Sequence, residues 1–296
     1  MGVAVFSNGN YTQLKEQQKY INSVKLNVKF TPKALSLFNF KKTINSDDCK
    51  YDLVYIVKQG DKNTDLKYSL RSVERFCNYR NIYIIGYKPS WVTNVKYIKT
   101  IQSTTKWKNA TNNILTACKT EEISDNFILM NDDFFAIKPI NNWKDNLNVC
   151  LGSLETAIER YNKSKRLSNW QNAFKEVFNL LVKLKCKHKY NYEAHVPLII
   201  NKKEFLEMYK IKEISDIHNS SNKPFHRRTS YKNLYFTDTP KVIKDVKIPF
   251  GRDLTDNYLD YSWLSVFDNV TDNRVRYKKL NAFLEHMFPN KSQYEK

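Results

Sequence analysis

Residues 127–140 have the sequence FILMNDDFFAIKPI, in which two adjacent carboxylates, Asp132 and Asp133, interrupt an apolar run. Burying an unpaired carboxylate costs several kcal/mol, so two carboxylates in such surroundings need a cation, a proton or water. The pattern predicts a buried strand that ends at the carboxylates. The simplest interpretation is a strand that ends in a solvated turn, and the rest of the chain is needed to test it.

Other segments with the composition of strands come earlier in the chain. Residues 51–57 (YDLVYIV) and 81–87 (NIYIIGY) are β-branched and aromatic, which predicts buried strands, and residues 95–101 (VKYIKTI) predict a short third strand. Between these strands, apolar residues recur at intervals of three and four. This periodicity predicts amphipathic helices over residues 66–78, with Thr64 or Asp65 as the N-cap, and over residues 106–119.

This alternation of strands and helices predicts an α/β fold with a mostly parallel sheet flanked by helices and right-handed crossovers. In such sheets, ligands gather at the carboxyl ends of the strands. Gln59, Gly60 and Asp61 follow one predicted strand, and Asp132 and Asp133 follow another. The sequence therefore predicts a polar site at one edge of the sheet.

The composition favours a polyanionic partner. Lys and Arg number 49 against 30 Asp and Glu, a formal charge of +19, and the chain has 19 Tyr and 17 Phe. A nucleic acid, a phosphate-bearing polymer, a nucleotide or an anionic membrane surface would suit this charge, although an A/T-rich genome explains part of the Lys and Asn content. Residues 152–190 are helical in period and basic, and predict either a solvated face or a polyanion-binding insertion. Their cations are Lys163, Lys165, Arg166, Lys183, Lys185, Lys187 and Lys189.

The cysteines and the apolar runs exclude several classes of protein. The five cysteines are far apart and show no C-x-x-C spacing, which argues against a zinc site or a disulfide framework. The first residues lack the layout of a signal peptide, and nowhere do 18 apolar residues run together. We therefore expect a cytoplasmic protein without a transmembrane segment.

Three separated segments resemble a known family in their order and spacing. YDLVYIVKQGD (51–61), DLKYSLRSVERFCNYRNIYIIGYKPSWV (65–92) and FILMNDDFFAIKPI (127–140) are similar to the first two conserved regions of the Stealth family of sugar-phosphate transferases. That family makes bacterial capsules and includes the lysosomal-enzyme GlcNAc-1-phosphotransferase. HVP (195–197) and FHRRTSY (225–231) resemble its third region, where a histidine and a downstream arginine belong to the active site.

The resemblance implies a GT-A-like core that binds a nucleotide sugar. Asp132 and Asp133 would hold Mn²⁺ or Mg²⁺ against the donor diphosphate, because these ions prefer hard oxygen ligands. His195 would be the general base for the acceptor hydroxyl, with His226 as its competitor. The remaining candidates are phosphate clamps and donor-binding residues: Arg71, Arg227, Arg228, Gln59, Gly60 and Asp61. One departure matters, since Gln59 stands where the family typically has an acidic residue.

We expect a single catalytic domain over residues 1–296. Residues 51–140 would form the nucleotide-sugar-binding core, residues 152–190 the basic helical insertion, and residues 191–296 the part that completes the active site on the acceptor side. The predicted reaction is metal-dependent transfer of a glycosyl or sugar-1-phosphate group to a hydroxyl of a polyanionic acceptor. Hydroxylated-base phage DNA is slightly favoured over a capsule or wall polymer.

The alternative is a non-catalytic nucleic-acid-binding protein in which the two aspartates only form a turn. It explains the charge but leaves the agreement of three motifs without a cause. A two-metal nuclease would need more acidic residues at strand ends than the sequence offers.

Overall fold

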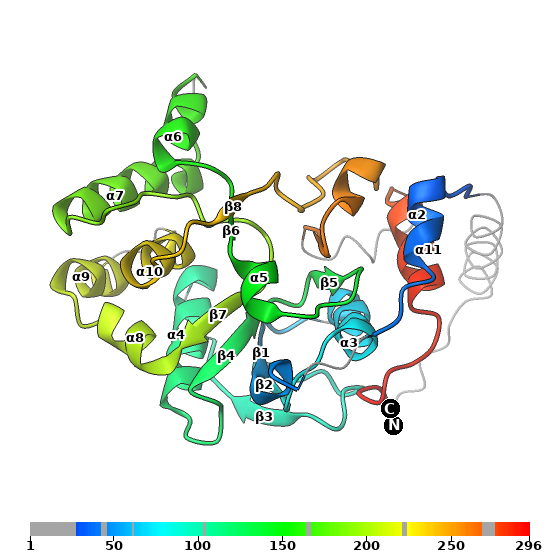
Figure 1. Ribbon diagram of the computed structural model, residues 1–296. Coiled ribbons are helices and arrows are strands. Elements are labelled where there is room, and N and C mark those ends of the chain that lie inside the picture. Colours follow the sequence, from blue (N-terminus) through cyan, green and yellow to red (C-terminus); the bar gives the residue numbers. More distant parts are fainter. Residues whose placement is uncertain are drawn as a thin grey trace, which may run out of the picture.

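The computed structural model describes residues 28–42, 46–60, 62–102, 105–163, 167–220, 224–267 and 276–296. A five-stranded sheet with the order β3-β2-β1-β4-β7 lies at its centre (Figure 1). The strands pair in parallel except for β7, which is antiparallel to β4. Their bounds are β1 (Asp52–Val57), β2 (Ile82–Gly86), β3 (Lys96–Lys99), β4 (Asn126–Met130) and β7 (Leu198–Asn201). The mostly parallel α/β sheet flanked by helices, predicted from the sequence, is confirmed.

The two faces of the sheet pack against different helices because successive strand residues point to opposite sides. Leu53 and Tyr55 of β1 share a buried cluster with Leu70 of α3 (Thr64–Phe76). Val54, between them, belongs instead to the cluster of α4 (Lys106–Lys119). The predicted order of strand, helix, strand, short strand, helix and strand is confirmed. The predicted N-cap of α3 is wrong by one or two residues, since Asn63 occupies that position with a φ of 49°.

Two short sheets extend this core. β5 (Phe134–Ala136) pairs antiparallel with β9 (Trp263–Ser265), and β6 (Val149–Cys150) pairs with β8 (Lys241–Val242). Helix α3 also holds β5 through two serines. Ser69 Oγ donates to the carbonyl of Phe134 at 2.6 Å, and the amide of Ala136 donates to Ser72 Oγ at 3.0 Å. The strand that follows Asp133 is therefore held by β9 on one side and by α3 on the other.

The predicted helices of the basic segment are present as α6 (Leu154–Asn162) and α7 (Asn169–Lys183), which pack together around a small core of their own and stand apart from the sheet in Figure 1. Lys165 and Arg166 of that segment lie outside the described residues. In the part of the chain that the structure describes, no helix is both long and apolar enough to span a bilayer. The remaining helices are α2 (Pro32–Leu37), α5 (Trp143–Leu147), α6 (Leu154–Asn162), α7 (Asn169–Lys183), α8 (Lys202–Met208), α9 (Lys212–Ser220), α10 (Arg227–Tyr235) and α11 (Lys278–Met287), with 3₁₀ turns η1 (Asp48–Lys50) and η2 (Asp256–Leu259).

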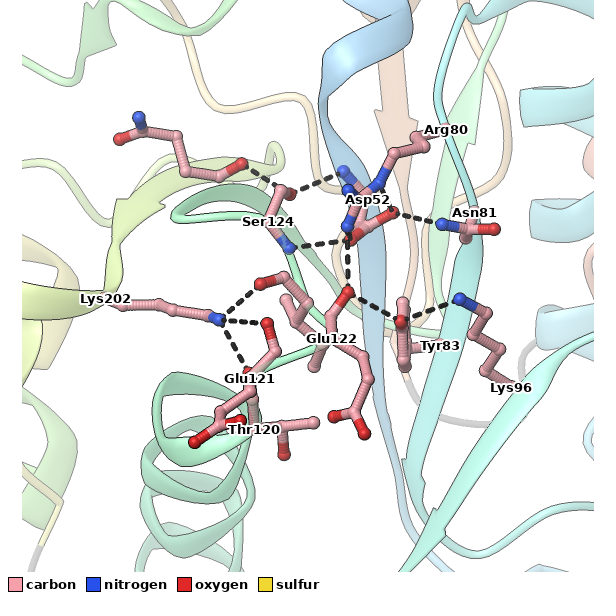
Figure 2. Close-up of polar contacts among 12 residues, drawn as sticks. Asp52, Arg80, Asn81, Tyr83, Lys96, Thr120, Glu121, Glu122, Ser124 and Lys202 are labelled. Atoms are coloured by element: carbon pink, nitrogen blue, oxygen red, sulfur yellow. Dashed lines mark hydrogen bonds and ion pairs between the residues drawn. The ribbon is translucent and has the colours of Figure 1, made fainter.

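A buried carboxylate ties together the chain at the amino end of β1 (Figure 2). Asp52 is fully buried and accepts hydrogen bonds from Arg80 at 3.0 and 2.5 Å, from Asn81 at 2.9 Å and from the amide of Ser124 at 2.8 Å. Nearby, Lys202 donates to backbone carbonyls in the loop after α4, including that of Thr120 at 2.6 Å. These contacts join the segments that lead into β1, β2 and β4.

We expect Asp52→Asn to lower the free energy of unfolding at pH 7 by about 2 kcal/mol, because hydrogen bonds to charged groups each contribute about 1.5–3 kcal/mol. Burial raises the pKa of Asp52, but hydrogen bonds from Arg80, Ser124 and Asn81 outweigh it, so the pKa lies below its ordinary value. The stabilisation is therefore present above the unfolded pKa of about 3.9 and is lost as the pH falls through the lower folded pKa. Urea unfolding between pH 3 and 8 measures it, with exposed Asp125→Asn as the matched control. Equal stability of the two variants would contradict the prediction.

Candidate active site

The two aspartates occupy a turn directly after β4. The amide of Phe134 donates to the carbonyl of Asn131 at 3.4 Å, which places Asp132 and Asp133 at the centre of the turn. Asp133 is only 6% exposed, and Ser265 Oγ donates to its Oδ2 at 3.1 Å. The simplest interpretation, a solvated turn, is thus right about the turn but wrong about solvation at Asp133.

As predicted, the carboxyl ends of β1 and β4 lie at the same edge of the sheet. Because β1 and β4 are parallel neighbours, Gln59 and Gly60 after β1 lie at the same edge as the aspartate turn after β4. Gln59 is exposed, and Asp61 lies outside the described residues. Gly86 ends β2 with a φ of 112°, and a Cβ there would lie 2.3 Å from the carbonyl of Val57, so only glycine allows this close approach.

Helix α10 brings Arg228 to the aspartate turn. Its guanidinium donates to the carbonyls of Val196 and Pro197 and lies 5.8 Å from the ring centre of Phe134. Burial lowers the pKa of Arg228 to about 10, while the charges of Glu193, Asp245 and Asp133 act in the opposite direction. The arginine is thus a half-buried cation that interacts with carboxylates of separate segments, including Asp133.

His195 forms a dyad with Asp245, a residue that the sequence analysis did not single out. Its Nδ1 lies 2.8 and 3.0 Å from the two carboxylate oxygens, and its amide donates to the same carboxylate at 3.2 Å. Because carboxylate oxygens only accept, we assign the proton to Nδ1, which leaves the lone pair on Nε2. Burial raises the pKa of Asp245, but the hydrogen bonds and charge of His195 outweigh it and hold the pKa below its ordinary value.

His226, the competing histidine, lies inside the protein. It is 1% exposed, its Nε2 lies 3.0 Å from the carbonyl of Trp170, and its ring contacts those of Trp170 and Phe174. Its Nδ1 lies 3.6 Å from Glu193, a carboxylate that also accepts from the amide and hydroxyl of Thr229 in the first turn of α10. Burial raises the pKa of Glu193, but the charge of His226 leads the effects that lower it to about 2. The position of His226 indicates that it holds α10 to α7.

The other two predicted arginines differ in their surroundings. The charge of Arg227 acts to lower the pKa of Tyr209, which follows α8, and that of His218 in α9. It also acts to lower the pKa of Glu193, the carboxylate close to His226. Arg71 forms a two-fold ion pair with Glu295 at 2.6 and 2.7 Å and donates to the carbonyl of Phe288 at 3.0 Å. Its guanidinium thus binds the C-terminal segment, and the structure does not bring it to the aspartate turn as a phosphate clamp.

Helix α10 also carries a buried cation, Lys232, that no sequence signal indicated. Its Nζ donates to the carbonyl of Leu147 at 2.9 Å and lies 4.6 Å and 4.7 Å from the ring centres of Tyr192 and Phe236. Burial, followed by the charge of Arg228, lowers the pKa of Lys232 to about 7. The chain therefore maintains a desolvated amine one helical turn from Arg228.

The low pKa of Lys232 predicts a pH-dependent stability. The folded protein holds this proton less tightly than the unfolded chain, so the lysine destabilises the fold fully below pH 7 and progressively less towards pH 10.5. We therefore compare the free energy of unfolding of Lys232→Met with that of the wild type at two pH values. The difference should favour the variant by on the order of 3 kcal/mol more at pH 6 than at pH 9.5. The lost hydrogen bond to Leu147 adds an offset that does not vary with pH. Denaturant unfolding at both pH values measures the difference, and a constant offset would contradict the assignment.

The aspartate turn offers suitable ligands for a divalent cation only together with a ligand that supplies more oxygens. Within the described ranges, no group of three or more His, Cys, Asp or Glu side chains is placed to hold a metal ion. Asp132, Asp133 and the hydroxyl of Ser265 are hard oxygen donors, which Mg²⁺ and Mn²⁺ prefer. Mg²⁺ is often held by one or two carboxylates plus substrate phosphates, and the turn fits this arrangement.

Comparisons with known proteins leave the family open. No protein-family model matches the chain. No curated protein matches it either. Among solved structures, the glycosyltransferase GlyE of Streptococcus pneumoniae TIGR4 aligns with a TM-score of 0.35 and 11% identity, over 66% of this chain and 45% of that one. The chain thus spans less than half the length of that structure.

Proposed function

We propose that this protein is a transferase that moves a glycosyl or sugar-1-phosphate group from a nucleotide sugar to a hydroxyl of a polyanionic acceptor. One observation carries the proposal: Asp133, Arg228 and the His195–Asp245 dyad come from separate segments and converge beside the carboxyl end of β4. Ligand sites of α/β sheets lie at this edge. A buried carboxylate next to a half-buried arginine and a histidine held by a carboxylate has the components of a group-transfer site.

Asp132 and Asp133 would hold Mn²⁺ or Mg²⁺ together with the donor diphosphate. When bound, the metal would neutralise charge on the leaving diphosphate or phosphate. Arg228 contributes a second, fixed positive charge close to Asp133, and its contacts with the carbonyls of Val196 and Pro197 hold it in place. A preorganised cation of this kind stabilises developing negative charge without reorganising.

His195 is suited to accept the proton of the acceptor hydroxyl. Asp245 binds Nδ1 and thereby fixes the tautomer in which Nε2 accepts. The same carboxylate stabilises the imidazolium that forms when the proton is transferred. The dyad thus supplies both orientation and charge compensation for general-base catalysis.

The proposed acceptor class and cellular location are inferred from the charge of the chain. The formal charge of +19 favours a polyanion, with nucleic acid ahead of a capsule or wall polymer, and a cytoplasmic location fits such an acceptor. A non-catalytic nucleic-acid-binding protein is the competing proposal. The convergence of Asp133, Arg228 and the His195–Asp245 dyad argues against it, because a protein that only binds nucleic acid has no use for a histidine held by a carboxylate at a strand end.

Thermal shift with a panel of UDP, GDP, CMP and dTDP sugars, each with and without Mn²⁺, tests the proposed function. We expect one donor to raise the midpoint of unfolding only when the metal is present, since ligands that bind the native state stabilise it. Addition of EDTA should remove the effect, and the free metal alone should not reproduce it. No metal-dependent shift with any donor would favour the non-catalytic alternative.

A further inference from the structure

Two exposed aromatic rings lie on the chain segments that build the active site. Phe250 is 66% exposed and Phe267 is 43% exposed, and their ring centres are 6.2 Å apart at an interplanar angle of 74°. Each ring has a cation over it: Arg276 lies 4.4 Å from the centre of Phe250, and Lys247 Nζ lies 4.4 Å from the centre of Phe267. We call these four residues the aromatic platform.

The platform is continuous with the catalytic groups. The amide of Ile248 donates to the carbonyl of Ser265 at 2.8 Å, and the segment around Lys247 runs parallel to β9. One of these paired segments begins with Asp245, the partner of His195, and the other contains Ser265, the partner of Asp133. At about 3.3 Å per extended residue, Phe267 stands roughly 7 Å along the chain from Ser265.

A tight turn holds Phe250 at the surface. The amide of Arg252 donates to the carbonyl of Pro249 at 3.0 Å, and Gly251 has a φ of 84°, which is the pattern of a type II turn. A Cβ at Gly251 would lie 2.9 Å from a guanidinium nitrogen of Arg276, so the glycine also admits the cation. The turn requires glycine at position 251, but a polar residue would serve at position 250.

An exposed phenylalanine that the fold does not require, beside a candidate active site, indicates a binding surface. Among the described residues, the two charged groups that lie over the rings are both cations, so charge complementarity selects a ligand that combines flat rings with negative charge. Single-stranded nucleic acids have this chemistry: their bases stack on aromatic side chains and their phosphates pair with Lys and Arg. A sugar-phosphate polymer would use the cations but has no planar base to stack.

We infer that the aromatic platform binds a single-stranded nucleic acid and presents one of its nucleotides to His195. This inference rests on the proposed transferase function for the role of the bound strand, and it names the acceptor class. Binding itself requires neither donor nor metal. It is therefore measured without them, and its failure leaves the donor-dependent thermal shift untouched.

The experiment uses fluorescence anisotropy of a labelled oligothymidylate of about 12 nucleotides, within the span that such sites cover. We expect Phe250→Ala and Phe267→Ala to weaken binding about 10-fold each, and Phe250→Trp to retain it. Phe40→Ala removes an equally apolar exposed ring elsewhere and should bind as the wild type does. Inorganic polyphosphate, which has charge but no bases, should bind the phenylalanine variants and the wild type equally.

The cations are tested with a matched charge control. Lys247→Gln with Arg276→Gln should weaken binding and reduce the slope of log affinity against log salt by about 1.4 units, since each phosphate contact on a single strand contributes about 0.7. Lys163→Gln with Lys187→Gln removes the same charge from the exposed basic segment of α6 and α7 and should leave the slope unchanged. Wild-type binding by the phenylalanine variants, or an equal loss in the Lys163 and Lys187 control, would overturn the inference. An equal loss of polyphosphate binding in the phenylalanine variants would also overturn it.

Discussion

Asp133→Asn is expected to reduce turnover by at least about 10³-fold while the folded structure is retained. The substitution keeps the shape of the side chain and an oxygen for the hydroxyl of Ser265, but it removes the negative charge next to Arg228. A neutral amide is a weaker ligand for a hard divalent cation, and charge stabilisation at the reacting centre is among the largest contributions to catalysis. The loss should therefore appear in kcat and in the donor-dependent thermal shift together.

Release of the nucleotide product and the thermal shift with donor and Mn²⁺ measure the two effects. Asp125→Asn, at an exposed position before the amino end of β4, is the matched control and should behave as the wild type. Ser265→Ala should cause a smaller loss, because it removes one neutral hydrogen bond to the carboxylate. Wild-type turnover of Asp133→Asn, or turnover that EDTA leaves unchanged, would refute the assignment of a metal to this turn.

The central fold was predictable because its signals are local. The apolar segments 51–57, 81–87 and 126–130 differ in period from the helices between them, and the parallel part of the sheet, β3-β2-β1-β4, follows that alternation. The aspartate turn was predictable for the same reason, since it ends an apolar run. Strand β7 was missed because its four residues precede a helix and pair antiparallel to β4, which no local pattern indicates.

The partners of the site residues were not predictable, because tertiary contacts set them. Asp245 is 50 residues from His195, and Ser265 is 132 residues from Asp133. Arg71 had the features of a phosphate ligand on an amphipathic helix, but Glu295, 224 residues away, pairs with it. Single-sequence reasoning therefore located the aspartate turn better than the groups that contact the candidate site residues.

His195→Ala is expected to lower turnover by about 10²–10⁴-fold, the usual contribution of a positioned general base, with little change in donor affinity. Asp245→Asn should lower turnover less, by about 10–100-fold, because it acts only through the orientation and charge compensation of His195.

The double variant separates positioning from an independent role for Asp245. If the carboxylate acts through the histidine, adding Asp245→Asn to His195→Ala causes no further loss, whereas independent groups give multiplying effects. His188→Ala, which removes a histidine stacked on Tyr190, is the control for histidine loss and should retain full turnover. If His195→Ala is fully active but melts well below the wild type, the dyad is structural. Because His226 is enclosed by Trp170 and Phe174, the general base would then be a carboxylate of the aspartate turn, such as Asp132.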